Sequence, residues 1–242
     1  MRKITINLAA VAAFCIVVAS PALVSSSCAT PKTEQEDTTI IREDSGITAL
    51  KYSSPEVPAS IEFCGKTIDL SRFDRHERMD RELLAFTYMH STSLQMLKKA
   101  NRYFPIVEPI LKENGIPDDF KYLMVIESNM NPTARSSAGA AGLWQFMQGT
   151  GRDYGLEVNN NVDERYHIEK ATRAACRYLK DAYAKYKDWV AVAASYNAGQ
   201  ARIASQLAKQ DVDDSLDLQL VEETARYVYR ILAAKQLFNA PT

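Results

Sequence analysis

Small side chains that recur at helical intervals are the feature that most constrains the fold of this chain. Between Ile168 and Tyr186, alanine, tyrosine and leucine recur on one side of a helix, at positions 171, 175, 178, 179 and 182. The next segment, Trp189 to Ala194, is apolar on all sides, which is typical of a buried helix, and Asp188 is suited to cap its start. Because alanine is short, such helices can approach one another closely. The pattern therefore predicts tightly packed helices.

Helical signals also cover most of the remaining chain. A charged start and recurring leucines predict a helix over 75–100, and a second is expected over 103–114, ended by Asn114-Gly115. Acidic residues in 116–119 suit the free amides of a helix start, and the last helix is expected over 220–238. Strand signals are nearly absent after a possible hairpin in 57–70. The predicted fold class is all-α, and the lack of a fixed repeat argues against a solenoid.

The N-terminus has the pattern of an export signal, expected over residues 1–27. Positive charge in Met1-Arg2-Lys3 precedes a short apolar core, and a serine run follows it. Two cleavage alternatives stay open. Cleavage within the serines leaves a soluble protein, whereas Cys28 resembles the lipid-accepting cysteine of bacterial lipoproteins and would provide a membrane tether. Residues 28–55 are polar and are expected to be a flexible linker. The protein is thus expected in the periplasm or attached to the outer membrane of a bacterium.

Charge, histidine and cysteine content give no support for a nucleic-acid partner or a metal. The formal net charge is −1, which gives no electrostatic case for nucleic acid. The histidines are scattered and the cysteine spacings fit no zinc pattern, so no metal is expected. In an oxidising compartment Cys64 and Cys176 could form a disulfide, or both could be small buried hydrophobic residues.

One carboxylate lies where a charge is unusual. At helical spacing Glu127 falls on the same face as the apolar residues Phe120, Leu123 and Met124. Burial raises the pKa of a carboxyl, so a Glu in this position could keep its proton near neutral pH and act as a general acid. The alternative is that Glu127 ends its helix with the carboxyl in solvent.

Four short segments follow one another in a specific order. They are Glu127-Ser128, Gly142-Leu143-Trp144-Gln145, Ser195-Tyr196-Asn197-Ala198-Gly199 and Glu223-Thr224-Ala225-Arg226-Tyr227-Val228. In this order they resemble the motifs of the lytic murein transglycosylases, whose catalytic domain is lysozyme-like. The resemblance extends from about residue 63 to 238. Gln148 departs from it, since the family usually has Pro there, and so does Ser195, where Ala is commoner.

The resemblance implies a fold and a reaction. A helical extension is expected over 56–115 and a lysozyme-like catalytic domain over 116–240. The substrate would be peptidoglycan glycan strands, and no cofactor is expected. Glu127 would protonate the bond between N-acetylmuramic acid and N-acetylglucosamine and then act as base, so that a 1,6-anhydro sugar forms.

The resemblance also implies further site residues. Substrate-binding roles would fall to Ser136, Gln145, Met147, Thr150, Tyr196, Asn197, Glu223 and Tyr227. Ser128 would support the end of the helix that carries Glu127 without contacting the substrate. The hydroxyl of Tyr196 is the expected hydrogen-bond partner of the carboxyl. Structural alternatives exist, because Met147 and Tyr196 could belong to the core, Ser128 could only cap a helix, and Glu223 could pair with Arg226.

Two other functions are compatible with the same sequence features. A hydrolase of the goose-lysozyme kind would use the same fold and Glu127 to add water to the same bond. A non-catalytic wall-binding protein would retain the fold without the chemistry.

Overall fold

The structure is a computed structural model that describes residues 55–239. The predicted export signal, most of the linker and Cys28 lie outside these residues. The described part contains a hairpin of β1 (Ser60–Phe63) and β2 (Lys66–Asp69), followed by eight helices. These are α1 (Phe73–Tyr88), α2 (His90–Glu113), α3 (Lys121–Ser128), α4 (Gln148–Asp153), α5 (Ile168–Tyr186), α6 (Trp189–Ala198), α7 (Gln200–Lys209) and α8 (Glu222–Asn239). Short 3-10 turns occupy Asp118–Phe120, Glu164–Tyr166 and Ser215–Asp217. The predominantly helical fold class is confirmed.

The hairpin follows from its turn residues. Cys64 and Gly65 have φ values of 53° and 82°, the left-handed pair that a tight two-residue hairpin turn requires. The register places Ile61 opposite Ile68, and both side chains are buried. The amide of Cys64 donates to Asp119 Oδ2 at 2.7 Å. The hairpin is thereby attached to the segment that leads into α3.

The boundary predicted between the first two helices is wrong. The sequence predicted helices over 75–100 and 103–114, but α1 ends at Tyr88 and α2 runs without interruption from residue 90 to 113. Pro105 and Pro109 lie inside α2 although neither can donate the helical hydrogen bond. The helix persists because its buried face continues through both prolines and packs on α5. Tertiary packing here outweighs the local preference.

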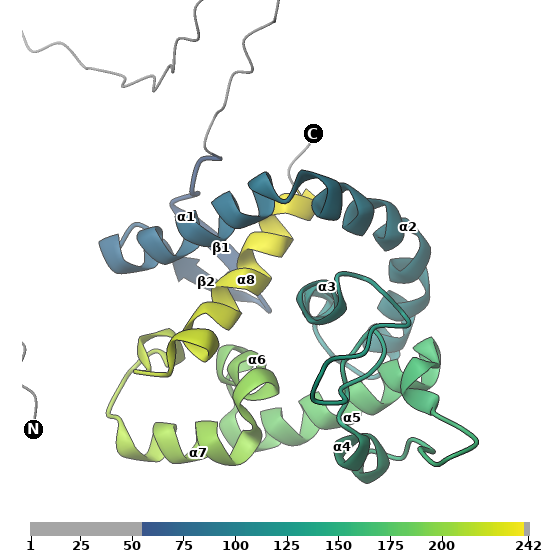
Figure 1. Cartoon of the computed structure of the whole chain (residues 1–242). Helices are drawn as coiled ribbons and strands as arrows, with labels where there is room; N and C mark the ends of the chain where they lie inside the picture. The colour runs from purple at the N-terminus through teal and green to yellow at the C-terminus, as the bar shows by residue number, and fades with distance from the viewer. Residues whose placement is uncertain (1–54, 240–242) are drawn as a thin grey trace, which may run out of the picture. The chain divides into compact units, whose positions relative to one another are not determined.

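Helix α8 is central to the packing. It contacts α1, α3 and α6, and α5 contacts α2 and α6 (Figure 1). Trp144, Tyr229 and Met124 are completely buried among these elements. Helices α5 and α6 begin and end close to their predicted bounds, and Asp188 caps α6 by accepting from the Val190 amide at 2.9 Å. The helices α4 and α7 were not predicted.

The glycine-rich run before Leu143 is an ordered loop in close contact with another segment. Gly142 has φ +77°, and a Cβ added to it would lie 2.0 Å from the carbonyl oxygen of Arg165. The buried Arg165 guanidinium donates to the carbonyls of Gly139 and Phe146 at 2.7 and 2.9 Å. The loop is thus held at both ends, which fixes the position of Gln145, the residue just before Phe146.

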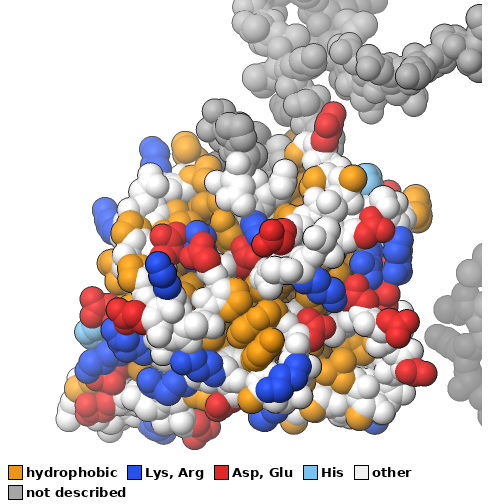
Figure 2. Space-filling view, turned by 180° about the vertical axis from the view of Figure 1, so that it is seen from behind, with side chains coloured by type: hydrophobic (Ala, Val, Ile, Leu, Met, Phe, Trp, Pro, Cys, Tyr) orange, Lys and Arg blue, Asp and Glu red, His pale blue; other side chains and the backbone are white. Residues whose placement is uncertain are grey.

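The surface of the described residues is mixed in charge. Figure 2 shows acidic and basic side chains interspersed around apolar ones on the face opposite to that in Figure 1. None of the helices within residues 55–239 has the length and apolar character that a membrane span requires.

Candidate active site

Glu127 lies in the last turn of α3. The helix ends directly after it because Asn129 and Met130 adopt left-handed backbone conformations, with φ of 50° and 58°. Ser128 is buried, and its hydroxyl donates to the Met124 carbonyl at 2.9 Å within the same helix. Ser128 therefore stabilises the end of α3 and makes no direct hydrogen bond to the carboxyl of Glu127. The side chain of Glu127 is half-buried.

The surroundings of Glu127 favour its protonated form. Burial raises its pKa to about 7, and the negative charge of Glu223 acts in the same direction. The hydrogen bond from Tyr227 and the positive charge of Arg230 oppose this shift but do not cancel it. Desolvation is the largest of these effects. A carboxyl whose pKa lies near neutral pH can both donate and accept a proton.

The hydrogen-bond partner predicted for the carboxyl is wrong. The Tyr227 hydroxyl, on α8, donates to Glu127 Oε1. The hydroxyl of Tyr196 donates instead to the Trp144 carbonyl at 2.7 Å. Tyr196 nevertheless lies near Glu127: burial raises the pKa of this tyrosine, and the charge of Glu127 raises it further. Tyr227 was predicted only as a substrate-binding residue, and no local sequence pattern indicates its bond to a carboxyl 100 positions away.

Five of the predicted substrate-binding residues line one cavity of about 280 Å³. They are Gln145, Met147, Thr150, Tyr196 and Asn197, joined by Phe146, Tyr178, Ala198 and Gly199. Met147 is 46% exposed, so it does not belong to the core, whereas its neighbour Phe146 is buried. The α4 start and the α6 end thus form a groove.

The amides in this groove are fixed by the scaffold. Gln145 donates through Nε2 to the Gly142 carbonyl at 2.8 Å, and its backbone has a left-handed φ of 48°. Asn197 Oδ1 accepts from the Thr224 hydroxyl at 2.9 Å, which ties the groove to α8. Within the described residues, the amide oxygen of Gln145 and the amide nitrogen of Asn197 make no hydrogen bond. Both polar atoms can therefore meet a ligand.

The other three predicted substrate-binding residues do not line this cavity: Ser136, Glu223 and Tyr227, the last of which is buried on α8. Ser136 is exposed in the loop, where its hydroxyl accepts from the Ala140 amide at 3.0 Å. Glu223 is exposed at the start of α8, close enough to Glu127 to raise its pKa. The alternative that Glu223 pairs with Arg226 is not what the structure shows, because Arg226 binds Glu82.

Both described cysteines are free thiols. Cys176 is buried in α5, where burial raises its pKa to about 11, and Cys64 is half-buried in the hairpin turn. This arrangement matches the alternative in which Cys64 and Cys176 act as small hydrophobic residues and do not form a disulfide. Residues 55–239 contain no group of three or more His, Cys, Asp or Glu side chains that could hold a metal ion.

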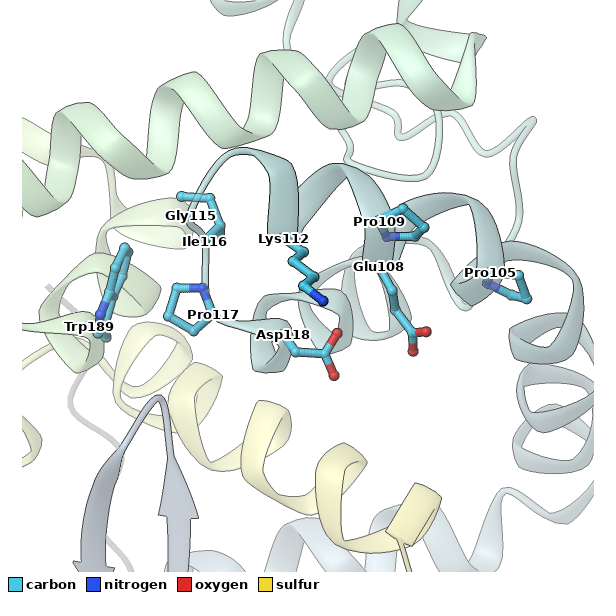
Figure 3. A pocket seen from close by; sticks show the side chains of 9 residues that line it. All are labelled: Pro105, Glu108, Pro109, Lys112, Gly115, Ile116, Pro117, Asp118 and Trp189. Atoms are coloured by element: carbon cyan, nitrogen blue, oxygen red, sulfur yellow. The ribbon is translucent and has the colours of Figure 1, made fainter.

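A larger cavity of about 820 Å³ lies between α2, the loop that follows it and the start of α6. It is lined by prolines of α2, Pro117 and Trp189, together with Glu108, Lys112 and Asp118 (Figure 3). No predicted site residue lines it. Lys121 bridges Glu108 and Asp118 with ion pairs of 2.8 and 2.6 Å. The cavity therefore differs from the groove beside Glu127 in both composition and position.

Comparison with known families identifies the class of domain that carries this site. Residues 105–217 match the transglycosylase SLT domain, so this part of the chain belongs to that family. The resemblance drawn from the four motifs is confirmed.

Several known proteins are similar to this chain. Membrane-bound lytic murein transglycosylase D of Escherichia coli K12 is 30% identical over 168 residues, which are 67% of this chain and 36% of the relative. Membrane-bound lytic murein transglycosylase C of Haemophilus ducreyi is 29% identical over 56% of this chain and 40% of its own. A solved structure, the 70 kDa soluble lytic transglycosylase of E. coli, is similar with a TM-score of 0.49 and 21% identity over 67% of this chain and 30% of that one. The chain thus spans about a third of the length of the type D relative.

Proposed function

We propose that this protein is an exported lytic transglycosylase. It cleaves the β-1,4 bond between N-acetylmuramic acid and N-acetylglucosamine in peptidoglycan and leaves a 1,6-anhydromuramic acid end. The observation that carries the proposal is the Glu127 carboxyl, with a pKa of about 7, which is bonded to Tyr227 and lies near Tyr196, a residue that lines a groove of amides and aromatic rings. The names of the relatives, lytic murein transglycosylases, support the substrate class.

A single carboxyl is sufficient for this reaction. Protonated Glu127 gives its proton to the glycosidic oxygen, the bond to the muramic acid breaks, and the 2-acetamido group of that sugar stabilises the cation in place of a second carboxylate. Ionised Glu127 then takes the proton of the 6-hydroxyl as its oxygen attacks the anomeric carbon. The Tyr227 hydroxyl stabilises the ionised form between the two steps. Because the nucleophile is part of the substrate, no water needs to be positioned.

The mass of the products distinguishes this reaction from hydrolysis. Digestion of purified sacculi should release fragments whose muramic acid ends are one water lighter than reducing ends. A goose-type hydrolase would leave reducing ends from the same bond. Products that carry only reducing ends would refute transglycosylation while leaving the substrate assignment in place.

Replacing Tyr227 with Phe should lower turnover about 10- to 100-fold, because a hydrogen bond to a charged group contributes about 1.5–3 kcal/mol. The loss of this donor should also raise the pKa of Glu127 further, since the bond stabilises the carboxylate. Rates of sacculus digestion across pH measure both effects. Tyr122→Phe is the matched control, since Tyr122 lies on α3 and bonds Asn239 away from the groove. Wild-type turnover in Tyr227→Phe would remove Tyr227 from the mechanism.

An envelope location fits this substrate. The N-terminal sequence and the membrane-bound relatives support export, with the protein either free after cleavage in the serine run or tethered through an acylated Cys28. Fractionation of cells that express Cys28→Ala separates the two alternatives.

A further inference from the structure

A buried carboxylate on α1 lies near the end of α3, the helix that carries Glu127. Glu82 is 2% exposed, and its carboxylate is surrounded by arginines. Arg226 donates to it through Nε at 2.7 Å and through Nη2 at 3.3 Å. Arg81 and Arg230 lie 3.3 and 3.8 Å from its oxygens. A charge this deeply buried requires such partners, and the cluster joins α1 to α8.

The same arginines border the end of the helix that carries Glu127. A small cavity of about 90 Å³ is lined by Glu82, Arg226 and Arg230 together with Ile126 and Asn129 of α3 and its cap. Ile126 directly precedes Glu127 in the chain. On α8, Arg230 follows Tyr227 by three residues, so the two side chains lie on neighbouring positions of one face. Arg230 thus forms an ion pair with Glu82 and also acts on Glu127, whose pKa its positive charge lowers.

We propose that Glu82 is a positioning residue that holds the Arg230 guanidinium away from the Glu127 carboxyl, so that Glu127 keeps its hydrogen bond with Tyr227. Arg230 is long and its side chain is 46% exposed, so it can reorient. An ion pair between Arg230 and Glu127 would stabilise the carboxylate and remove the proton that the first step needs. Glu82 offers Arg230 and Arg226 a competing carboxylate that is already buried. The consequence for catalysis rests on the proposed function, but the electrostatic coupling does not.

The groups that face Glu127 allow this effect to be isolated. Tyr227, Arg230 and Glu223 approach from α8, and Tyr196 approaches from α6. Arg230 is the positive charge among them, and it lowers the pKa of Glu127. Changing Glu82 or Arg230 leaves Tyr227, Glu223 and Tyr196 intact. The helical extension, through α1, would thereby act on the acid of the catalytic domain.

The test follows the ionisation of Glu127 directly. In the full chain labelled with ¹³C at glutamate side chains, the Glu127 carboxyl signal is assigned by its absence in Glu127→Gln and titrated by NMR. Glu82→Gln should lower the midpoint by about one pH unit, since an opposite charge within about 4–6 Å shifts a carboxyl pKa by about 1–3 units. The pH above which sacculus digestion declines should fall by the same amount.

Arg230→Gln should move the midpoint in the opposite direction, and adding it to Glu82→Gln should cancel the downward shift. Arg81→Gln is the matched control, because Arg81 contacts Glu82 and Glu222 and should leave the midpoint unchanged. An unchanged midpoint in a folded Glu82→Gln protein would overturn the proposal. If that variant does not fold, the Arg230→Gln variant decides, and an unchanged midpoint there overturns it equally. The NMR midpoints do not depend on activity, so failure of the proposed function would be recognised separately, by sacculus digestion that survives Glu127→Gln.

Discussion

Sacculi incubated with the Glu127→Gln protein should remain intact. Glutamine has nearly the shape of glutamate but no proton to give to the glycosidic oxygen and no base to receive one. General acid–base catalysis contributes about 100- to 10,000-fold to a rate, and Glu127 would act in both steps, so we expect a loss at the upper end of this range. Release of soluble fragments over time measures it. Glu169→Gln, the same change at an exposed position in the first turn of α5, should digest sacculi like the wild type.

Digestion by Glu127→Gln at the wild-type rate would contradict the assignment. A wild-type protein that binds sacculi but releases nothing would instead favour the non-catalytic wall-binding alternative.

The same variant should remove a pH dependence of stability. The carboxyl of Glu127 has a pKa of about 7 in the folded chain and an ordinary value of 4.5. Between these values the folded chain binds more protons than the unfolded chain, so the free energy of unfolding falls as pH rises, by up to about 3 kcal/mol. Above about pH 7, the pKa of Glu127 in the folded chain, the whole of this stabilising contribution is lost. Urea denaturation at about pH 5 and pH 8 should show this fall in the wild type and a smaller one in Glu127→Gln.

Replacing Gly142 with Ala should be the most destabilising of the single changes considered. The new Cβ would lie 2.0 Å from the Arg165 carbonyl oxygen, which is backbone and cannot swing aside. The left-handed conformation costs about 1–2 kcal/mol for a residue with a Cβ, and relieving the overlap costs about 1–3 kcal/mol more. A loss of about 2–5 kcal/mol in the free energy of unfolding is therefore expected. Activity should fall as well, because Gln145 and the Trp144 carbonyl that holds Tyr196 directly follow.

Gly139→Ala separates the two contributions. Gly139 also has a positive φ, of 90°, but a Cβ there would meet nothing within 4 Å. The free energy of unfolding of this variant should fall only by the cost of the left-handed conformation. Equal destabilisation of the two variants, measured by thermal or urea unfolding, would show that the contact with Arg165 is unimportant.

Local signals were sufficient to predict several parts of this structure. Helix α5 has the predicted bounds of Ile168 and Tyr186, because its alanine pattern is long and the cap residue Asp188 marks the start of the next helix. The hairpin turn was recognisable from Gly65, and Glu127 from its place on an apolar face. In each case the residues that determine the outcome lie within a few positions of one another.

Long-range contacts determined what could not be predicted. The sequence predicted a separate helix from residue 103, but the buried face of α2 keeps Pro105 inside one longer helix. The bond from Tyr227 to Glu127 joins residues 100 positions apart, and that from Arg226 to Glu82 spans 144. The motifs implied that Tyr196 and Tyr227 belong to the site, but their hydrogen bonds depend on how α8 packs on α3 and α6. No local pattern contains that information.

The central claim is that the 6-hydroxyl of the substrate, rather than water, closes on the muramic acid while Glu127 transfers the proton. Digesting sacculi in water enriched in ¹⁸O and weighing the newly formed muramic acid ends tests it most directly. We predict anhydro ends that contain no ¹⁸O, produced by the wild type and absent with Glu127→Gln. Incorporation of one ¹⁸O atom at each new end would contradict the account.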